Sequence, residues 1–312
     1  MSLVKCVSTK FEGSKTALNL AGIFLIVMAA TAAPAQAAFQ SITTCNPTVA
    51  APAGSLINAP GDYQLTTNLT QTTIADCILI TASNVSLKLN RYQITSTNAA
   101  STGSGIDVNP PAGRVSHVGI EGPGLIQGFE NGIFFTYADY CQVDLVTAAN
   151  NSYGGIVGFG VTFLTAVSNV LVRNGNWGLT LGESTGGTIQ YNEANGNGAA
   201  TGGGAGGGIA VKSSIANTLN NNTASANGPQ SGLPTYAAGI LIDGNSNRVY
   251  GNSTDGNILT GIQVTSGSGN QIFSNTSSVG NGRFDLEDDN VACDSDVWGN
   301  NGFFNANRAC IH

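Results

Sequence analysis

Short apolar runs of β-strand type recur along the chain, and from residue 105 onward each is marked by the same two-residue step. The step is glycine followed by isoleucine, or once by leucine, with its glycines at Gly105, Gly132, Gly155, Gly178, Gly208, Gly239 and Gly261. Arg283-Phe284 occupies the next position, and the intervals are 27, 23, 23, 30, 31, 22 and 22 residues. A repeat of this length is typical of one coil of a solenoid, because a single coil cannot bury its apolar face and must stack.

Asparagine recurs with the same period as the glycine step. One column follows the repeat glycines by 18 to 20 residues: Asn150, Asn174, Asn197, Asn227, Asn257 and Asn281. A second follows by 13 or 14: Asn169, Asn192, Asn222, Asn252 and Asn275. Stacked strands place equivalent residues about 4.8 Å apart, so these side chains are expected to hydrogen-bond as ladders. Their role is therefore structural, and they are not read as ligands.

The pattern predicts an all-β, single-stranded solenoid of roughly nine or ten coils with capped ends. In runs such as Ile240-Leu241-Ile242, alternate side chains point into the coil and out of it. Residues 38–62 are irregular and are expected to form an N-terminal cap, residues 63–290 the coils and residues 291–312 a C-terminal cap. Open solenoid edges need such caps because their strands carry unpaired backbone groups.

The first 37 residues have the composition of a cleaved export signal. Three lysines precede an apolar, uncharged stretch from Ala17 to Ala33, and residues 34–37 end in an Ala-x-Ala pattern. The stretch is short for a bilayer span. We therefore expect a mature protein that starts at Ala38, lies in the periplasm or outside the cell, and has no membrane span.

Charge excludes one class of partner. The whole chain has a net charge of −7, and removal of the signal leaves 17 acidic and 8 basic residues, a net charge of −9. Nucleic acids and anionic membranes require clusters of lysine and arginine, which this sequence lacks. No nucleic-acid partner is expected.

Five cysteines remain after the signal. Their spacing in an exported chain favours pairing of Cys45 with Cys77 and of Cys293 with Cys310, one bond near each open end of the solenoid. Cys141 has no partner in this scheme, and we expect a buried free thiol inside a coil.

The chain resembles the right-handed parallel β-helix proteins of the pectate-lyase-like class, and more narrowly the exported bacterial proteins with NosD-type repeats. The resemblance spans about residues 60–310 and is carried by ITASNVSLKLNRYQITS (80–96), GPGLIQGFENGIFF (122–135) and NRVYGNSTDGNILTGIQV (247–264). It implies a right-handed parallel β-helix. It implies no single activity, because the same coil hosts lyases, hydrolases, epimerases, adhesins and inert shafts.

Known catalytic patterns of this class are missing. Polygalacturonase-type enzymes share clustered aspartates beside Gly-His-Gly and Arg-x-Lys motifs. This sequence contains no comparable set of residues. The densest acidic run contains Asp285, Glu287 and Asp289, which are weak candidates for calcium. A solvated acidic cap is the simpler interpretation, so no cofactor is expected.

One column of residues has the register of a binding face. Gly182, Lys212, Asp243, Thr265 and Glu287 lie four residues beyond the repeat position, with Glu183 beside the first of them. Lys212 and Asp243 are expected to be neighbours one coil apart. Two insertions at the same place in consecutive repeats, 198–207 and 228–238, are expected to adjoin this face, and the second contains Tyr236.

Three functions remain open on the sequence. The first is non-catalytic binding of a polysaccharide or cell-envelope glycan through Glu183, Lys212, Tyr236 and Asp243. The second is a structural or adhesive surface shaft, favoured by the regular asparagine columns. The third is a polysaccharide lyase or glycoside hydrolase, in which Glu183 and Asp243 supply carboxylates and Lys212 a base.

Overall fold

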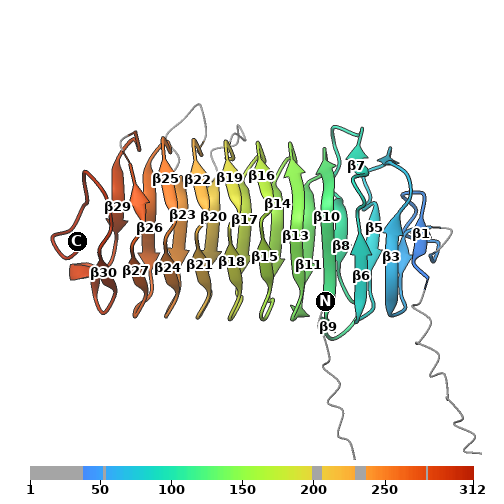
Figure 1. Cartoon of the computed structure of the whole chain (residues 1–312), viewed down its shortest axis with the longest axis horizontal. Coiled ribbons are helices and arrows are strands. Elements are labelled where there is room, and N and C mark those ends of the chain that lie inside the picture. Colours follow the sequence, from blue (N-terminus) through green and yellow to red (C-terminus); the bar gives the residue numbers. More distant parts are fainter. Residues whose placement is uncertain (1–37, 52–53, 199–205, 229–236, 279) are drawn as a thin grey trace, which may run out of the picture. The chain divides into compact units, whose positions relative to one another are not determined.

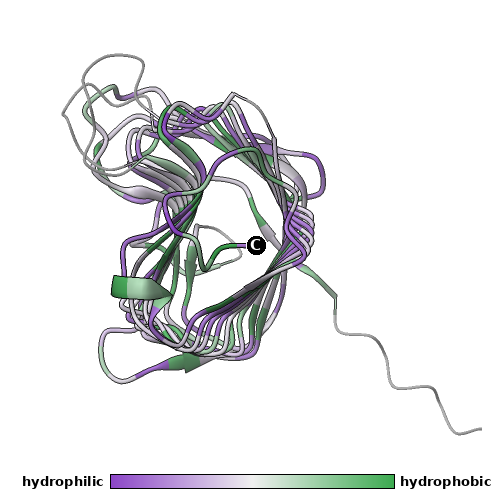
Figure 2. Ribbon diagram, turned by 90° about the vertical axis from the view of Figure 1, so that its left-hand side faces the viewer, coloured by the Kyte–Doolittle hydropathy of each residue, from purple (hydrophilic) through white to green (hydrophobic). Residues whose placement is uncertain are grey.

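A computed structural model describes residues 38–51, 54–198, 206–228, 237–278 and 280–312. The expected signal at 1–37 lies outside these residues. Every strand pair within the described ranges is parallel, and successive coils superpose when viewed along the stack (Figures 1 and 2). In this part of the chain no helix is long and apolar enough to cross a bilayer.

One face of each coil belongs to a continuous ten-stranded sheet, which confirms the predicted number of coils. Its strands, in spatial order, are β2 (Leu56–Ile57), β5 (Ile78–Ile80), β8 (Ser104–Val108), β11 (Asn131–Thr136), β14 (Gly154–Phe159), β17 (Trp177–Gly182), β20 (Gly207–Lys212), β23 (Ala238–Asp243), β26 (Thr260–Ser266) and β29 (Phe284–Asp288). The glycine step lies at the start of these strands, from β8 to β26.

The other two faces of the coils belong to one eighteen-stranded sheet, and we call the row of strands on each face a leg. The long strands β10 (Val118–Gln127) and β13 (Gln142–Ala149) belong to both legs and join them. The first leg also contains β1 (Gln40–Ile42), β3 (Gly61–Leu65), β6 (Val85–Lys88), β15 (Thr165–Val167), β18 (Thr188–Gln190), β21 (Thr218–Asn220), β24 (Arg248–Tyr250), β27 (Gln271–Phe273) and β30 (Val297–Gly299). The second leg also contains β4 (Leu69–Gln71), β7 (Gln93–Ser96), β16 (Val170–Val172), β19 (Glu193–Asn195), β22 (Thr223–Ser225), β25 (Ser253–Asp255) and β28 (Thr276–Ser277). Two short pieces complete the fold, the pair β9 (Val115–Ser116) with β12 (Ala138–Asp139) and the 3₁₀ turn η1 (Val291–Cys293).

The two periodic signals of the sequence meet at one corner of the coil. A Cβ atom on Gly155 would lie 2.9 Å from the Nδ2 atom of Asn174 and 2.5 Å from the carbonyl oxygen of Gly178. Gly178 has the same relation to Asn197, again at 2.9 Å. Glycine recurs because the ladder asparagine and the next coil's backbone fill the space that a side chain would need.

Three buried asparagine ladders run through the stack. The first contains Asn169, Asn192, Asn222, Asn252, Asn275 and Asn301, and the second Asn151, Asn174, Asn197, Asn227, Asn257 and Asn281. A third, which the sequence analysis missed, joins Asn217, Asn247 and Asn270 and ends on Asp296. Each Nδ2 donates to the Oδ1 of the next coil at 2.9–3.2 Å.

The prediction of Asn150 as the first rung of the second ladder was wrong by one residue. Asn151 is buried and bonds Asn174, whereas Asn150 is exposed in the left-handed region, with φ of 53°. Asparagine tolerates that conformation, so Asn150 forms the turn beside the ladder.

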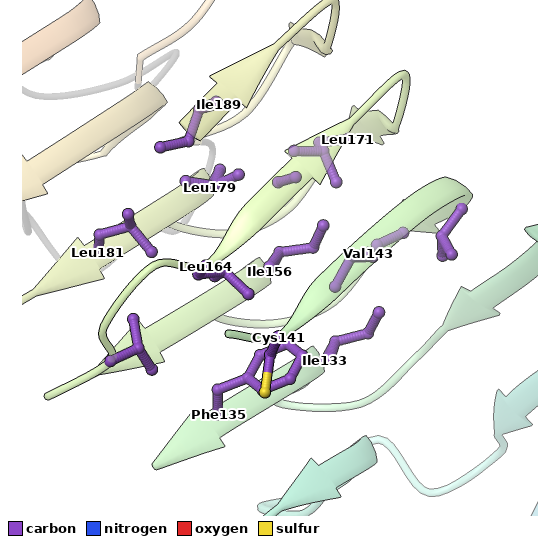
Figure 3. Close-up of a cluster of buried hydrophobic side chains, with 14 of the residues drawn as sticks. Ile133, Phe135, Cys141, Val143, Ile156, Leu164, Leu171, Leu179, Leu181 and Ile189 are labelled. Carbon is purple, nitrogen blue, oxygen red and sulfur yellow. The ribbon is translucent and has the colours of Figure 1, made fainter. Parts of the chain in front are cut away.

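Aliphatic side chains from the three faces fill the coil interior (Figure 3). Cys141 lies among them beside Ile133 and Phe135, buried and without a disulfide partner, as expected. Burial raises the pKa of its thiol to about 11, so it remains protonated and acts as a small apolar side chain.

Disulfides link Cys45 to Cys77 and Cys293 to Cys310, which confirms both predicted pairs. The acidic run at the C-terminal end accepts hydrogen bonds within the protein. Asp285 accepts from the backbone of Phe304 at 2.8 Å, and Asp289 accepts from Gln263 at 2.9 Å. Asp285 and Glu287 are buried, so the interpretation of the run as a solvated cap was wrong: these carboxylates organise the last coil and its cap.

Candidate functional site

The outer face of the ten-stranded sheet carries a pocket of about 450 Å³ over β11, β14, β17 and β20. We call it the outer pocket. Its lining residues are Glu130, Asn131, Phe134, Tyr153, Val157, Gly158, Phe159, Thr180, Gly182, Glu183, Lys212 and Ser213. Strand alternation places Phe134, Val157 and Thr180 in this lining, because the residues on either side of them point into the core.

Strand register places the floor and one wall of the outer pocket. Phe134, Val157 and Thr180 are paired in consecutive coils and form the floor. Two residues further along the strands, Gly182 is paired with both Phe159 and Lys212. Gly182 has no side chain, and the ring of Phe159 lies over it: a Cβ atom on Gly182 would lie 3.4 Å from that ring.

Aromatic rings make up much of the apolar surface in this pocket. Tyr153 is 41% exposed and Phe159 is 37% exposed, while Phe134 is half-buried beneath them. Phe134 lies on β11, Tyr153 precedes β14 and Phe159 ends it, so no single sequence motif contains the three. The sequence did not predict these rings as part of a site.

Lys212 forms the far wall. Its ammonium group lies 5.0 Å from the centre of the Trp177 ring, a cation–π arrangement. Burial lowers the pKa of Lys212, and the nearby charge of Asp243 acts in the opposite direction. Among the described residues its Nζ atom has no hydrogen-bond acceptor and no carboxylate within 4.0 Å.

The predicted candidates are only partly brought together. Glu183 and Lys212 both line the outer pocket, and Tyr236 lies outside the described residues. Asp243 does not line the pocket: it accepts a hydrogen bond of 2.5 Å from Ser266, and the β23–β26 register shifts just before it. No ion pair within 4.0 Å joins Asp243 to Lys212.

Glu287 also departs from the predicted column. It is paired with Gln263 rather than with Thr265, and its side chain is fully buried. There it accepts a hydrogen bond of 2.6 Å from Thr260 and forms an ion pair with Arg283. The acidic run contains no metal cluster either: within the described ranges no three His, Cys, Asp or Glu side chains could hold an ion.

Two polar atoms in the pocket lining lack hydrogen-bond partners among the described residues. They are Oδ1 of Asn131 and Oγ1 of Thr180, and both side chains are less than one-tenth exposed. Buried polar groups are normally satisfied, and those of the asparagine ladders in this molecule are. The two orphaned atoms therefore mark the pocket as a place where a ligand hydroxyl or amide can gain hydrogen bonds.

The two carboxylates of the pocket stand at its opposite edges. Glu130 precedes the first residue of β11, whereas Glu183 follows the last residue of β17. A six-residue strand spans about 20 Å, so their backbones are about that far apart along the strand direction. Glycoside hydrolases hold their two carboxyl groups roughly 5–10 Å apart, so these two do not form such a pair.

A family model described as the right handed beta helix region matches residues 104–278. The chain belongs to the right-handed β-helix family. The match covers the coils from β8 to β28, and the outer pocket lies within it. No curated protein matches the sequence of this β-helix.

Several solved structures share its fold. The Dettilon tailspike protein has a TM-score of 0.56 at 15% identity, with 80% of this chain and 50% of the tailspike covered. A DFA-IIIase from Arthrobacter chlorophenolicus A6 in complex with GF2 has a TM-score of 0.51 at 13% identity, with 76% and 69% covered. A GH136 lacto-N-biosidase from Eubacterium ramulus also has a TM-score of 0.51, at 11% identity, with 80% and 63% covered.

This β-helix therefore spans half the length of the tailspike that it resembles. At 11–15% identity the likeness shows the fold and leaves the activity to be argued from the site.

Proposed function

We propose that this protein binds a polysaccharide or cell-envelope glycan in the outer pocket and does not cut it. The observation that carries the proposal is the lining itself, in which exposed aromatic rings adjoin polar atoms that have no partner. Tyr153 and Phe159 offer apolar ring surface, and Asn131 and Thr180 offer hydrogen-bonding atoms. Sugars require both, because each ring has apolar C–H surfaces and a rim of hydroxyl groups.

Binding without cleavage is favoured by the position of the charged groups. Glu130 and Glu183 are too far apart to act on one glycosidic bond. Lys212 has a charge that faces the pocket without a counter-ion, which suits a hydroxyl-rich or acidic sugar. The names of the tailspike, the DFA-IIIase and the lacto-N-biosidase agree with a glycan-related role for this fold.

Affinity electrophoresis tests the proposal. The mature protein is run through gels containing alginate, polygalacturonate, dextran or xylan, and retardation gives an apparent Kd for each polymer. Tyr153→Ala and Lys212→Ala are expected to weaken retardation in the same gel at least tenfold. Tyr191→Asn is the control, because Tyr191 is 59% exposed on a different corner and does not line the pocket.

Size-exclusion chromatography of the same polymers separates binding from catalysis. A polymer that co-elutes intact with the protein supports a binding module. A polymer that becomes shorter with time makes the protein a lyase or hydrolase and overturns the non-catalytic part of the proposal. Retention equal in wild type and pocket variants removes the outer pocket as the site.

A structural or adhesive shaft is the second candidate, and the three asparagine ladders favour it because they stiffen the stack. If no gel retards the protein, with or without calcium, the structural or adhesive shaft becomes the favoured function. For either function we propose export to the periplasm or the cell exterior. The two disulfides support this location, because such bonds persist in oxidising compartments.

A further inference from the structure

A cluster of exposed rings lies on the corner that follows the pocket-lining strands. We call it the aromatic ridge, and it consists of His117, Tyr137, Tyr140, Phe159 and Phe163. Tyr137 is 47% exposed, Tyr140 56% and Phe163 45%. The rings form two groups on this corner, the stack of His117, Tyr140 and Phe163 and the pair of Tyr137 and Phe159. Exposed apolar surface of this kind marks interaction sites on proteins.

The rings of the ridge are mutually ordered. His117 stacks on Tyr140 with centroids 5.5 Å apart, and Tyr140 stacks on Phe163 at 4.9 Å, both at 17° between planes. Tyr137 meets Phe159 edge-on at 6.1 Å. Such pairs hold one another in place, so the ridge is a preformed surface rather than a set of independent side chains.

The fold does not require aromatic residues at these positions. His117, Tyr140 and Phe163 occupy one corner column in the left-handed region, with φ of 57°, 52° and 55°. The same corner in the next two coils uses Gly186 and Ala216, also at positive φ. Bulky residues are disfavoured in this conformation, so three aromatic residues there weaken the fold locally without improving its core.

Neighbouring glycines make room for the rings. A Cβ atom on Gly160 would lie 2.8 Å from the ring of Tyr137, and one on Gly186 would lie 2.6 Å from the ring of Phe163. Each ring thus leans over a coil that has no side chain at that point. The unfavourable backbone conformation of the aromatic residues and the glycines that make room for their rings occur together. This combination is typical of a functional surface.

The ridge is continuous with the outer pocket, because Phe159 belongs to both. It also has a polar border. Arg114 lies 6.0 Å from the centre of the Tyr137 ring and forms an ion pair of 2.7 Å with Asp139 between the two tyrosines. Rings beside hydroxyl, guanidinium and carboxylate groups match the mixed surface of a sugar chain better than the apolar surface of a protein partner.

We propose that the aromatic ridge is a second binding segment that accepts the continuation of a polysaccharide chain held in the outer pocket. The protein then recognises the interior of a long glycan, and short fragments fill the pocket alone. This inference rests on the proposed function.

The two binding segments, the outer pocket and the aromatic ridge, are distinguished by comparing the affinity for a polymer with the affinity for its short fragments. The probes are alginate, polygalacturonate, dextran and xylan, each compared with its own di- and trisaccharides by isothermal titration. Tyr137→Asn and Tyr140→Asn remove the rings while keeping a residue that tolerates positive φ. Tyr191→Asn is the matched control, because Tyr191 has φ of 56° and is 59% exposed away from the ridge. Circular dichroism of each variant checks that it is folded.

Tyr140→Asn is expected to bind the polymer at least tenfold more weakly and the trisaccharide with unchanged affinity. Tyr137→Asn, which removes the ring packed on the pocket residue Phe159, is expected to weaken polymer binding at least as much. The pocket variant Tyr153→Ala is expected to lose both. Ridge variants that bind the polymer like wild type, while Tyr153→Ala does not, overturn the ridge and leave the pocket. If wild type binds no probe, the proposed function fails and the ridge with it. A dimer of wild type that Tyr140→Asn disperses would assign the ridge to self-association instead.

Discussion

Asp107 provides a test of the electrostatics on the outer face. Its strand β8 borders the pocket strand β11, and Asp107 is paired with the pocket residue Phe134. The side chain is 7% exposed, and its Oδ1 atom has no hydrogen-bond partner among the described residues. Burial, assisted by the charge of Asp76, raises the pKa of Asp107 from 3.8 to about 7.

The sign of the pH effect follows from this direction. Above pH 4 the carboxyl group is ionised in the unfolded chain, whereas the folded protein keeps the proton until about pH 7. The contribution to stability is therefore fully present below pH 4 and is lost as pH rises through 7. A shift of about 3 units corresponds to a loss of about 4 kcal/mol at pH 8.5.

Asp107→Asn removes the ionisation while keeping the shape of the neutral carboxyl group. The variant and wild type should have nearly equal free energies of unfolding at pH 4, and the variant should be more stable by about 4 kcal/mol at pH 8.5. Urea titrations followed by the fluorescence of buried Trp177 and Trp298 measure the difference at each pH. Asp255→Asn, on an exposed side chain, corrects for the loss of one negative charge.

A stability difference between Asp107→Asn and wild type that stays constant from pH 4 to 8.5 would refute the reasoning. It would mean that the carboxylate is ionised in the folded protein and that water or a cation compensates its burial. A difference that grows between about pH 4 and pH 7 and is constant above pH 7 supports it.

Three further predictions concern the stability of the stack. Asn197→Ala should lower the free energy of unfolding by about 3 kcal/mol or more in urea titrations, because it leaves buried donors of the adjacent rung unsatisfied. Gly178→Ala should lower the Tm in differential scanning fluorimetry, since its Cβ would lie 2.8 Å from the next coil's carbonyl oxygen, whereas Gly119→Ala, with nothing within 4 Å, should not. Reduction of the bond between Cys293 and Cys310 should destabilise the C-terminal coil by about 3 kcal/mol, seen as faster hydrogen exchange there. Equal Tm values for the two alanine variants, or exchange unchanged by reduction, would contradict the packing described here.

The coil architecture could be predicted because it depends on residues that repeat. Residues equivalent to Gly178 and Asn197 recur because each coil needs the same corner, and seven glycines and six asparagines make the pattern visible. The third ladder escaped notice because it has only three asparagines before Asp296. Asn150 was chosen over Asn151 because both are asparagine and spacing alone cannot separate them.

The site was harder to predict because it depends on neighbours that differ from coil to coil. Glu183 and Lys212 were found from register, which strands preserve. Asp243 follows the β20–β23 pairing in the predicted register, but its bond to Ser266 and its position outside the pocket lining could not be read from the sequence. Tyr153 and Phe159 could not be predicted because Tyr153 precedes β14 and Phe159 ends it, and only the folded sheet assembles them with Glu130 and Lys212.

The third ladder gives the molecule a defined end. Each amide in it donates toward the C-terminal side, so the column has a polarity and could in principle continue into another molecule. Asp296 interrupts it, because its carboxylate accepts from Asn270 at 3.1 Å and has no proton to pass on. The other oxygen of Asp296 accepts from Asn290 at 3.1 Å, so both oxygens of the last rung are bonded within the protein. The ladder therefore ends on a side chain that joins it to the C-terminal turn.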